Sequence, residues 1–311
     1  MDFACDRIQD ATLVSAAEWL GRPTGAPLAS WLLVDAALIE GSRLSSMSKE
    51  AGFVCVNSLD RCPLVAFGDR APQLLAVRDA AQALEFVRGL MFLDRTTPAF
   101  SFFRSAASIS DLQDLFGYLA LPQVEGGLEL HCRFADTRVL PSLLRTLSPA
   151  QVLRVGALIT EWSWFDRTND IDRWSAADGE QPGAHTPDAM PRARLTDQQF
   201  ASMLDAGEAD MIFSTLIEKT PEVIPEEFRG QFHSILQKHL DAATRRFVTQ
   251  HNDRLQFVVL CLTCGEHFDR HPDLVSTWRS VRKSDASLSG LMKTWSNGLW
   301  KELQGFTEPM Q

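Results

Sequence analysis

The chain has 311 residues, a formal net charge of −10 and an apolar content of 45%. This apolar content is enough for the packed core of one large domain or of two ordinary ones, so we expect a globular protein. Acidic residues outnumber basic residues in both halves of the sequence. Nucleic-acid-binding surfaces neutralise phosphates with Lys and Arg, so we expect no nucleic-acid partner.

The first ten residues, MDFACDRIQD, contain acids where a signal peptide would need a basic region followed by an apolar one. No uninterrupted apolar run approaches the length that spans a membrane. We therefore expect a cytoplasmic protein without membrane insertion. The six cysteines lie mostly within apolar segments, as is typical of a reducing compartment, and their spacing does not indicate a disulfide framework.

The first part of the chain alternates apolar strands with amphipathic helices. Apolar residues at helical spacing predict a first helix at 9–20. The continuous apolar runs at 31–35 and 53–56 predict two central strands of a sheet that is covered on both faces. This alternation favours an α/β layer arrangement. Further strands are expected at 71–77 and 99–105, with helices that begin at Asp79 and at Ser108 or Ser110.

Residues 128–147 (LELHCRFADTRVLPSLLRTL) combine a strand pattern with a helix pattern. Apolar residues at every second position up to Phe134 predict a strand with one buried face, so Phe134 belongs to the core. Asp136 stands where its carboxylate can cap a helix, and leucines follow at helical spacing. Pro141 fits best in the first turn, so the helix begins at Asp136 or a few residues later.

The rest of the chain predicts the end of the sheet, a linker and then helices. Residues 157–165 and 170–175 predict an antiparallel hairpin, which makes the expected sheet mixed. A capping box of Thr196 and Gln199 begins the region in which every long segment is helical. We expect an α/β lobe with a mixed sheet and flanking helices at 1–175, a Pro/Gly-rich linker at 176–194 and an all-α helical bundle at 195–311.

Metal and catalytic chemistry are both weakly indicated. A single helix would spread the zinc-type residues of the run at 261–271 over about three turns, roughly 15 Å, which is too far for one ion. His131 is a lone histidine on the polar face of its strand. We therefore expect no metal, no cofactor and no catalytic residue. Two alternatives stay open: a hydrolase that uses His131 with nearby carboxylates, and a zinc-stabilised interaction module that uses Cys261, Cys264, His267 and His271.

The segment at 133–140 resembles the RF-x-DPRVL signature of the type VI secretion effector chaperones, also called adaptors (Tap or TEC proteins). Thr137 stands where that family usually has proline, which removes a preset helical φ. Residues 32–37 (LLVDAA) resemble the family's LLDGA strand, and residues 71–74 (APQL) resemble its APYL. The three segments occur in the family's order. The residues that carry the signature, which we interpret as a structural motif, are Arg133, Phe134, Asp136 and Arg138.

The resemblance implies a cytosolic, non-enzymatic adaptor. Such a protein binds a toxic effector before secretion and helps to load it on the VgrG spike, without being exported itself. Its partners would be the type VI effector and VgrG.

Aromatic residues near the junction of the two lobes are candidates for binding a partner, because lobe interfaces commonly hold ligands and aromatic anchors carry much of the energy of interfaces. The alternative is that these residues pack in the core, since Trp162 and Trp164 would face the same side of a strand. The candidates are Trp162, Trp164, Phe165 and Trp174.

Overall fold

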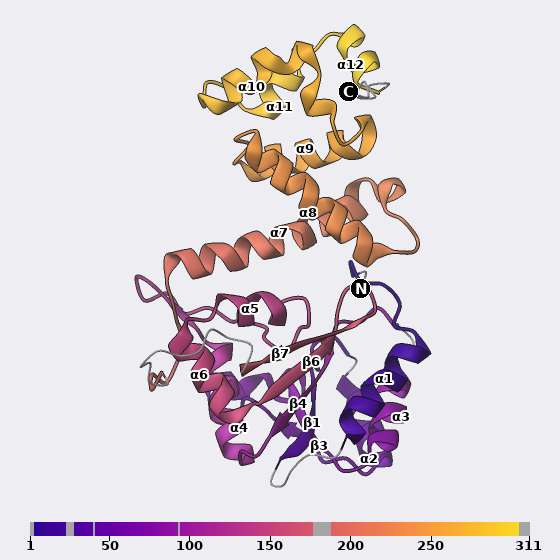
Figure 1. The fold of residues 1–311 in the computed structure, drawn as a ribbon, viewed down its shortest axis with the longest axis vertical. Coiled ribbons are helices and arrows are strands. Elements are labelled where there is room, and N and C mark those ends of the chain that lie inside the picture. The colour runs from indigo at the N-terminus through magenta and orange to yellow at the C-terminus, as the bar shows by residue number, and fades with distance from the viewer. Residues whose placement is uncertain (1–2, 23–27, 40, 93, 177–187, 305–311) are drawn as a thin grey trace. The chain divides into compact units, whose positions relative to one another are not determined.

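The computed structural model describes residues 3–22, 28–39, 41–92, 94–176 and 188–304 (Figure 1). The chain divides into two compact units. Unit 1 comprises Met1–Gly207 with Glu227–Gly230, and unit 2 comprises Glu208–Glu226 with Gln231–Gln311. The boundary lies inside helix α7 (Asp197–Lys219).

Unit 1 is built on a six-stranded sheet with the strand order β2-β3-β1-β4-β6-β7. Each strand runs antiparallel to its neighbours. The apolar run of β1 lies near the middle, as expected for a strand that is buried on both faces. The strands are β1 (Ala29–Val34), β2 (Val56–Asn57), β3 (Gln73–Val77), β4 (Phe100–Ser105), β6 (Glu161–Phe165) and β7 (Ile171–Ser175).

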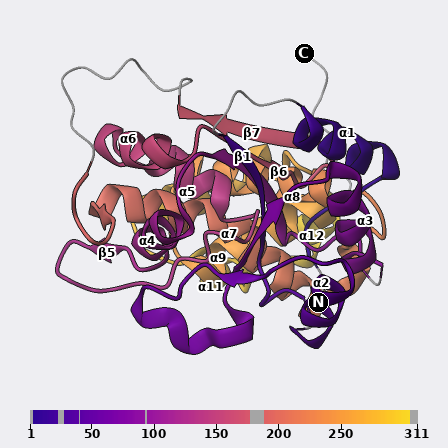
Figure 2. The ribbon, with the colours of Figure 1, turned by 90° about the horizontal axis from the view of Figure 1, so that it is seen from below.

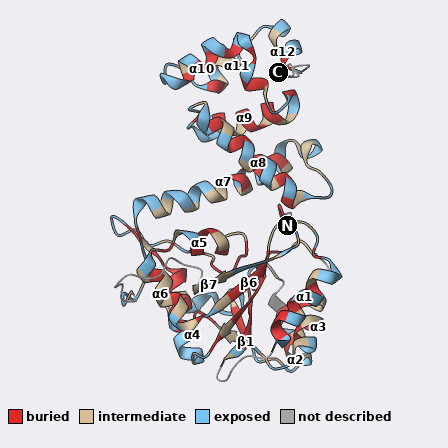
Figure 3. Ribbon diagram, in the orientation of Figure 1, coloured by how far each residue is buried: buried red, intermediate tan, exposed pale blue. Residues whose placement is uncertain are grey.

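Helices cover both faces of this sheet (Figure 2). Leu32 and Val34 of β1 face the first group of helices, and Trp31 and Leu33 face the second, because side chains alternate along a strand. Figure 3 shows buried positions along the strands and exposed outer faces on the helices. The first group is α1 (Asp10–Gly21), α2 (Gly41–Glu50) and α3 (Ala80–Leu90); the second is α4 (Ile109–Ala120), α5 (Leu140–Thr146) and α6 (Pro149–Leu158).

The predicted α/β fold class is confirmed, but the main sheet is antiparallel rather than mixed. The strand-helix-strand unit β3-α3-β4 does place two strands in the same direction. However, β1 lies between them and pairs antiparallel with both. Among the described strands, the parallel pairing occurs in a small separate sheet of β5 (Gln123–Val124) and β8 (Arg194–Leu195).

Two predicted strands differ from the structure. The alternating segment at 128–134 is irregular, with a single bridge between Gln123 and Glu129. Its backbone pairs instead with the end of α4, since Cys132 N donates to Ala120 O at 2.9 Å. The apolar run at 53–56 is not central: only its last residue enters β2, at an edge of the sheet.

The predicted linker at 176–194 lies partly outside the described residues, which resume at Asp188. Its final residue belongs to β8, and Ala193 N donates to Tyr118 O at 3.1 Å, so residues 188–195 are part of unit 1. The boundary between the units therefore comes later than the predicted start of the helical lobe at residue 195.

Unit 2 is a set of helices around a small aromatic core. Phe257 of α9 lies 5.1 Å from Phe268 and 5.8 Å from Trp278, measured between ring centroids. Gly265 ends α9 with a φ of 102°, which a glycine adopts without strain. Besides the end of α7, the helices are α8 (Arg229–Arg245), α9 (His251–Cys264), α10 (Val275–Arg282), α11 (Leu288–Met292) and α12 (Asn297–Gln304), with short turns η3 (Pro221–Val223), η4 (Phe268–Arg270) and η5 (Pro272–Leu274).

Within the described parts of the chain, no helix has both the length and the apolar character that membrane crossing requires.

Candidate functional site

The corner at 133–140 is held by a buried carboxylate. Asp136 is 1% exposed and accepts from Arg138 at both oxygens, from Nε at 3.0 Å and from Nη2 at 2.7 Å. The same carboxylate accepts from the backbone N–H of Arg138 at 3.0 Å, so it fixes the turn that precedes α5. Helix α5 itself begins at Leu140, four residues after the predicted earliest start, with Pro141 in its first turn as predicted.

Arg133 connects this corner to the end of β1. Its Nη2 lies 2.8 Å from Oδ2 of Asp35, and its Nη1 lies 3.8 Å from Oδ2 of Asp136. Burial raises the pKa of Asp35 above its ordinary value, and the nearby Asp136 carboxylate adds to this effect, whereas Arg133 opposes it. Two arginines thus neutralise two buried carboxylates, and the result is a fixed cross-link between β1 and the corner.

Phe134, the apolar residue of the corner, packs into the core between the sheet and α4. The ring of Phe134 stacks on that of Phe116 from α4, with centroids 5.0 Å apart and planes 8° apart. Thr137 N donates to Pro98 O at 3.0 Å. A proline at position 137 would lack this donor, so threonine here changes the hydrogen bonding of the corner as well as its backbone φ. The four predicted motif residues therefore lie together in one structural corner.

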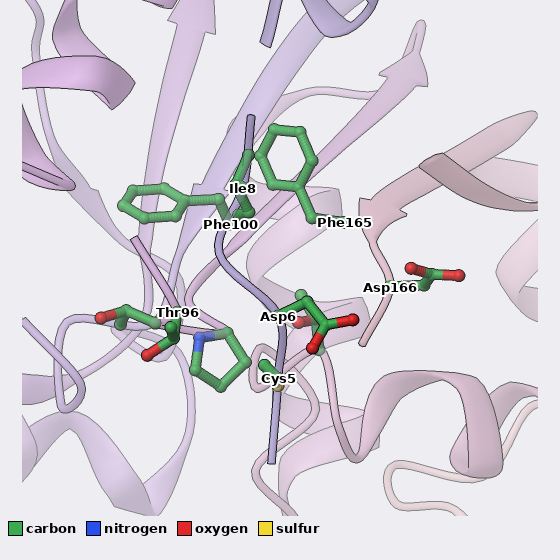
Figure 4. Close-up of a pocket in the computed structure, with 10 residues that line it drawn as sticks. Cys5, Asp6, Ile8, Thr96, Phe100, Phe165 and Asp166 are labelled. Atoms are coloured by element: carbon green, nitrogen blue, oxygen red, sulfur yellow. The ribbon is translucent and has the colours of Figure 1, made fainter. Parts of the chain in front are cut away.

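The N-terminal segment crosses the same end of the sheet. Asp6 N donates to Arg167 O at 2.7 Å, and Ile8 N donates to Arg95 O at 3.0 Å. Beneath this segment lies a cavity of about 10 Å³, lined in part by Cys5, Phe100 and Phe165 (Figure 4). Such a volume holds about one water molecule, so this cavity is not a site for a substrate.

The predicted aromatic partner-binding residues are mostly core residues, which corrects the expectation that they form an exposed docking surface. Trp162, Trp164 and Phe165 are 0%, 3% and 4% exposed. They lie on β6, which is paired with β4 on one side and β7 on the other and is covered by helices on both faces. Trp174 of β7 is half-buried and packs against the same core as Trp162.

His131 contacts an aromatic ring rather than a carboxylate among the described residues. Its ring lies 5.0 Å from that of Phe67, and no described carboxylate forms a hydrogen bond or ion pair with it. Partial burial and the neighbouring Arg133 charge lower its pKa below the ordinary value. Asp166 and Asp170 belong to the turn between β6 and β7, where Asp166 Oδ1 accepts from Thr168 N at 2.8 Å, and Asp172 lies on β7.

The four zinc-type residues are dispersed in unit 2. Cys261 and Cys264 are buried in its apolar core, and burial raises the pKa of the Cys261 thiol, which opposes the thiolate form that zinc binds. His267 Nε2 lies 3.3 Å from Glu266, and His271 Nε2 lies 3.8 Å from Glu302. Among the residues that the structure describes, no cluster of three or more metal-binding side chains occurs.

The β2 edge has a larger pocket that the sequence pattern did not predict. Its volume is about 430 Å³, and α2, the segment at 53–55 and the turns of η1 (Pro63–Arg70) contribute to its lining. Val54 at its rim is 77% exposed. The signal in the sequence was the apolar run itself, but its composition could not distinguish a buried central strand from an exposed edge.

Comparison of the chain with curated proteins gave no match, and comparison with solved structures gave none either. A family profile does match part of unit 1, from β1 into α6, a range that contains both the corner and the pocket at the β2 edge. Residues 30–154 match the family described as Domain of unknown function (DUF4123), a family associated with type VI secretion effector adaptors and chaperones.

Proposed function

We propose that this protein is a cytoplasmic adaptor of the Tap or TEC type. It binds a type VI secretion effector and promotes the loading of that effector on the VgrG spike, without being secreted itself. It acts by binding and not by catalysis. The observation that carries the proposal is the match of residues 30–154 to a family associated with type VI secretion effector adaptors.

The corner supports a binding role because its charged groups are already engaged. Asp35 and Asp136 are 2% and 1% exposed, and each accepts from an arginine. Carboxylates held in this way position the strand and helix ends around them. The corner is thus suited to hold a rigid frame for a surface elsewhere on unit 1.

The test is affinity purification of the full-length tagged chain from its native cells, under conditions in which the secretion machine is expressed. We expect mass spectrometry to recover a large toxin-like protein, with or without a VgrG protein. The purified pair should then form a stoichiometric complex on size-exclusion chromatography. Deletion of the gene should abolish export of that effector, while the adaptor itself stays in the cell pellet.

Two controls make the result specific. A tag-only purification removes proteins that bind the resin, and a strain without the secretion genes shows whether the effector depends on them. Recovery of neither an effector nor VgrG from expressing cells would contradict the proposal. Export of the chain together with the effector would contradict its role as an adaptor that stays behind.

A further inference from the structure

The N-terminal segment at 3–9 contacts two parts of unit 1 that are distant from it in sequence. One is the turn at 166–170 between β6 and β7. The other is Glu227–Gly230, a stretch of unit 1 whose neighbours in sequence on both sides belong to unit 2. The chain therefore passes between the units three times, once inside α7 and once at each end of this stretch. Whatever holds the stretch on unit 1 fixes two of these passages.

Asp6 forms hydrogen bonds with both parts. Its backbone N–H donates to Arg167 O in the turn at 2.7 Å. Oδ1 of its carboxylate accepts from the backbone N–H of Gly230 at 2.8 Å. Gly230 is the second residue of α8, and the first four N–H groups of a helix have no acceptor within the helix. The Asp6 carboxylate therefore caps α8 from a position 224 residues away in sequence.

The same contact requires glycine at position 230. A Cβ atom at this position would collide with the carbonyl carbon and oxygen of Arg167. Glycine is a poor helix former, so its presence in the first turn of α8 is explained by the close approach of the helix start to the turn at 166–170. A larger residue would force the helix start and the turn apart.

The turn at 166–170 gives this contact a fixed base. Asn169 Oδ1 accepts from the backbone N–H of Gln9 at 2.7 Å, and Asn169 O accepts from Oγ1 of Thr12 at 2.9 Å. Within the turn, Asp166 Oδ1 accepts from the backbone N–H of Asp170 at 2.9 Å. These bonds join the turn to the N-terminal segment without residues 227–230. The stretch at 227–230 can therefore leave this base without disrupting it.

Phe228 lies in this stretch and has a strained backbone. Its φ of 58° falls in the left-handed region, which is unfavourable for a bulky side chain. The side chain is 61% exposed, so burial of the ring contributes little to offset the strain. Strained residues persist only where the surroundings impose the conformation. The hydrogen bond and the close contact at Gly230, two residues further along the chain, impose such a constraint.

We propose that the N-terminal segment is a clasp, closed by the bond from Gly230 to Asp6, and that the strain at Phe228 favours its opening. When the clasp is closed, residues 227–230 belong to unit 1. When it opens, the three passages between the units become one, inside α7, and unit 2 gains freedom to move. This device controls the mobility of unit 2 whichever partner the protein binds.

Hydrogen exchange of the Gly230 amide in the full-length chain, measured by NMR, reports the closed state, since this N–H forms the bond. Asp6→Ala should accelerate the exchange about 10-fold, because the N–H loses its acceptor. Asp6→Asn should keep most of the protection, because an amide oxygen also accepts hydrogen bonds. Asp10→Ala is the matched control, since Asp10 pairs with Arg95 at 3.1 Å instead. Equal acceleration by Asp6→Ala and Asp10→Ala would contradict the clasp.

Substitution of Phe228 tests the strain separately. Phe228→Gly should slow the exchange of the Gly230 amide about 3-fold, because glycine adopts a φ of 58° without strain and the closed state becomes more favourable. Phe228→Ala is the matched control. It removes the ring but keeps a Cβ in the left-handed conformation, so the exchange should stay within about 2-fold of the unmodified chain. Faster exchange in Phe228→Gly than in Phe228→Ala would contradict the role of strain.

Tryptic cleavage after Arg229 gives a second readout, because the bond from Arg229 to Gly230 lies in the clasp. Asp6→Ala should accelerate this cleavage about 10-fold, whereas cleavage after Lys283 in unit 2 stays the same within one sample. Gly230→Ala opens the clasp by a different route, through the collision with Arg167, and should accelerate the cleavage after Arg229 as well. Unchanged cleavage in both variants would overturn the proposal.

Small-angle X-ray scattering of the full-length chain measures how freely the units move. Asp6→Ala should populate a wider range of radii of gyration than the unmodified chain, and Asp10→Ala should match the unmodified chain. An unchanged range in a variant whose Gly230 amide exchanges faster would mean that the clasp opens without freeing unit 2, and the proposal would be wrong. Thermal unfolding verifies that each variant is folded. If Asp6→Ala does not fold, the comparison of Phe228→Gly with Phe228→Ala remains as the test, since neither removes the bond to Asp6.

Discussion

Asp136 is the residue on which the corner at 133–140 depends most. Replacement by Asn keeps the shape but removes the charge that pairs with both nitrogens of Arg138. We expect Asp136→Asn to lower the free energy of unfolding by about 2 kcal/mol, because a partly buried guanidinium loses its counter-charge. Urea unfolding measures this loss. Asp114→Asn, in an exposed pair with Arg61, is the control and should have a much smaller effect. Equal effects would contradict the assigned role of Asp136.

Asp35 should make stability depend on pH in a defined direction. Its pKa is raised in the folded protein above the ordinary value of 3.8. An acid whose pKa is raised in the folded protein contributes stability that is fully present below pH 3.8 and is lost as the pH rises through the pKa of the folded state. The stability of the unmodified chain relative to Asp35→Asn should therefore fall as the pH rises from 3.8 towards neutrality.

Urea unfolding of both proteins at several pH values tests this direction, and the comparison cancels the other titrating groups. If the unmodified chain instead gains stability over Asp35→Asn as the pH rises, the attraction of Arg133 outweighs burial.

At the scale of secondary-structure elements, the helix starts depend on local hydrogen bonds. Ser108 accepts from Asp111 N at 3.2 Å, and Asp111 accepts in return from Ser108 N at 3.2 Å. Ser108→Ala should lower the free energy of unfolding by about 1 kcal/mol, because it removes this cap from α4. Ser15→Ala, at an exposed position within α1, is the matched control and should change stability little. A similar loss of stability in both variants would mean that the loss in Ser108→Ala does not come from the removed cap.

Local chemistry explains which elements could be predicted from the sequence. The caps at Asp79 and Ser108 lie where the pattern placed them, because capping involves residues within three positions of each other. The strand at 128–134 was predicted wrongly, because alternation shows which side chains are buried but not what the backbone pairs with. The segment does not join the main sheet, and its backbone is bonded to the end of α4 and the residues just after it.

The candidate site was predicted only in part for the same reason. Side chains close in sequence, such as Arg133 and Asp136, could be grouped as a corner, but the bond from Arg133 to Asp35 joins residues 98 positions apart and leaves no local signal. Trp162 and Val54 are both apolar residues of predicted strands. Trp162 lies on the interior strand β6 and is fully buried, whereas Val54 lies just before the short edge strand β2 and is 77% exposed.

At the scale of the whole molecule, two units with separate cores should respond separately to damage. Phe257 is fully buried in the core of unit 2, and Phe116 is fully buried in that of unit 1. Phe257→Ala should cost about 3–5 kcal/mol and accelerate amide hydrogen exchange in α9, while exchange in β1 and β4 stays slow. Phe116→Ala should show the reverse pattern. Faster exchange throughout the chain in both variants would mean that the units unfold together.

The position of β1 between β3 and β4 has a consequence for how the chain folds during synthesis. Trp31 pairs with Ala76 on one side and with Phe103 on the other, and Phe103 pairs in turn with Trp162. The strand that is made first must therefore wait for two later strands, and its backbone groups stay unpaired on one side until the ribosome has passed β4. Such long-range pairing slows folding and exposes the nascent chain to aggregation. Release of a product truncated before β6 would leave β4 as a bare apolar edge.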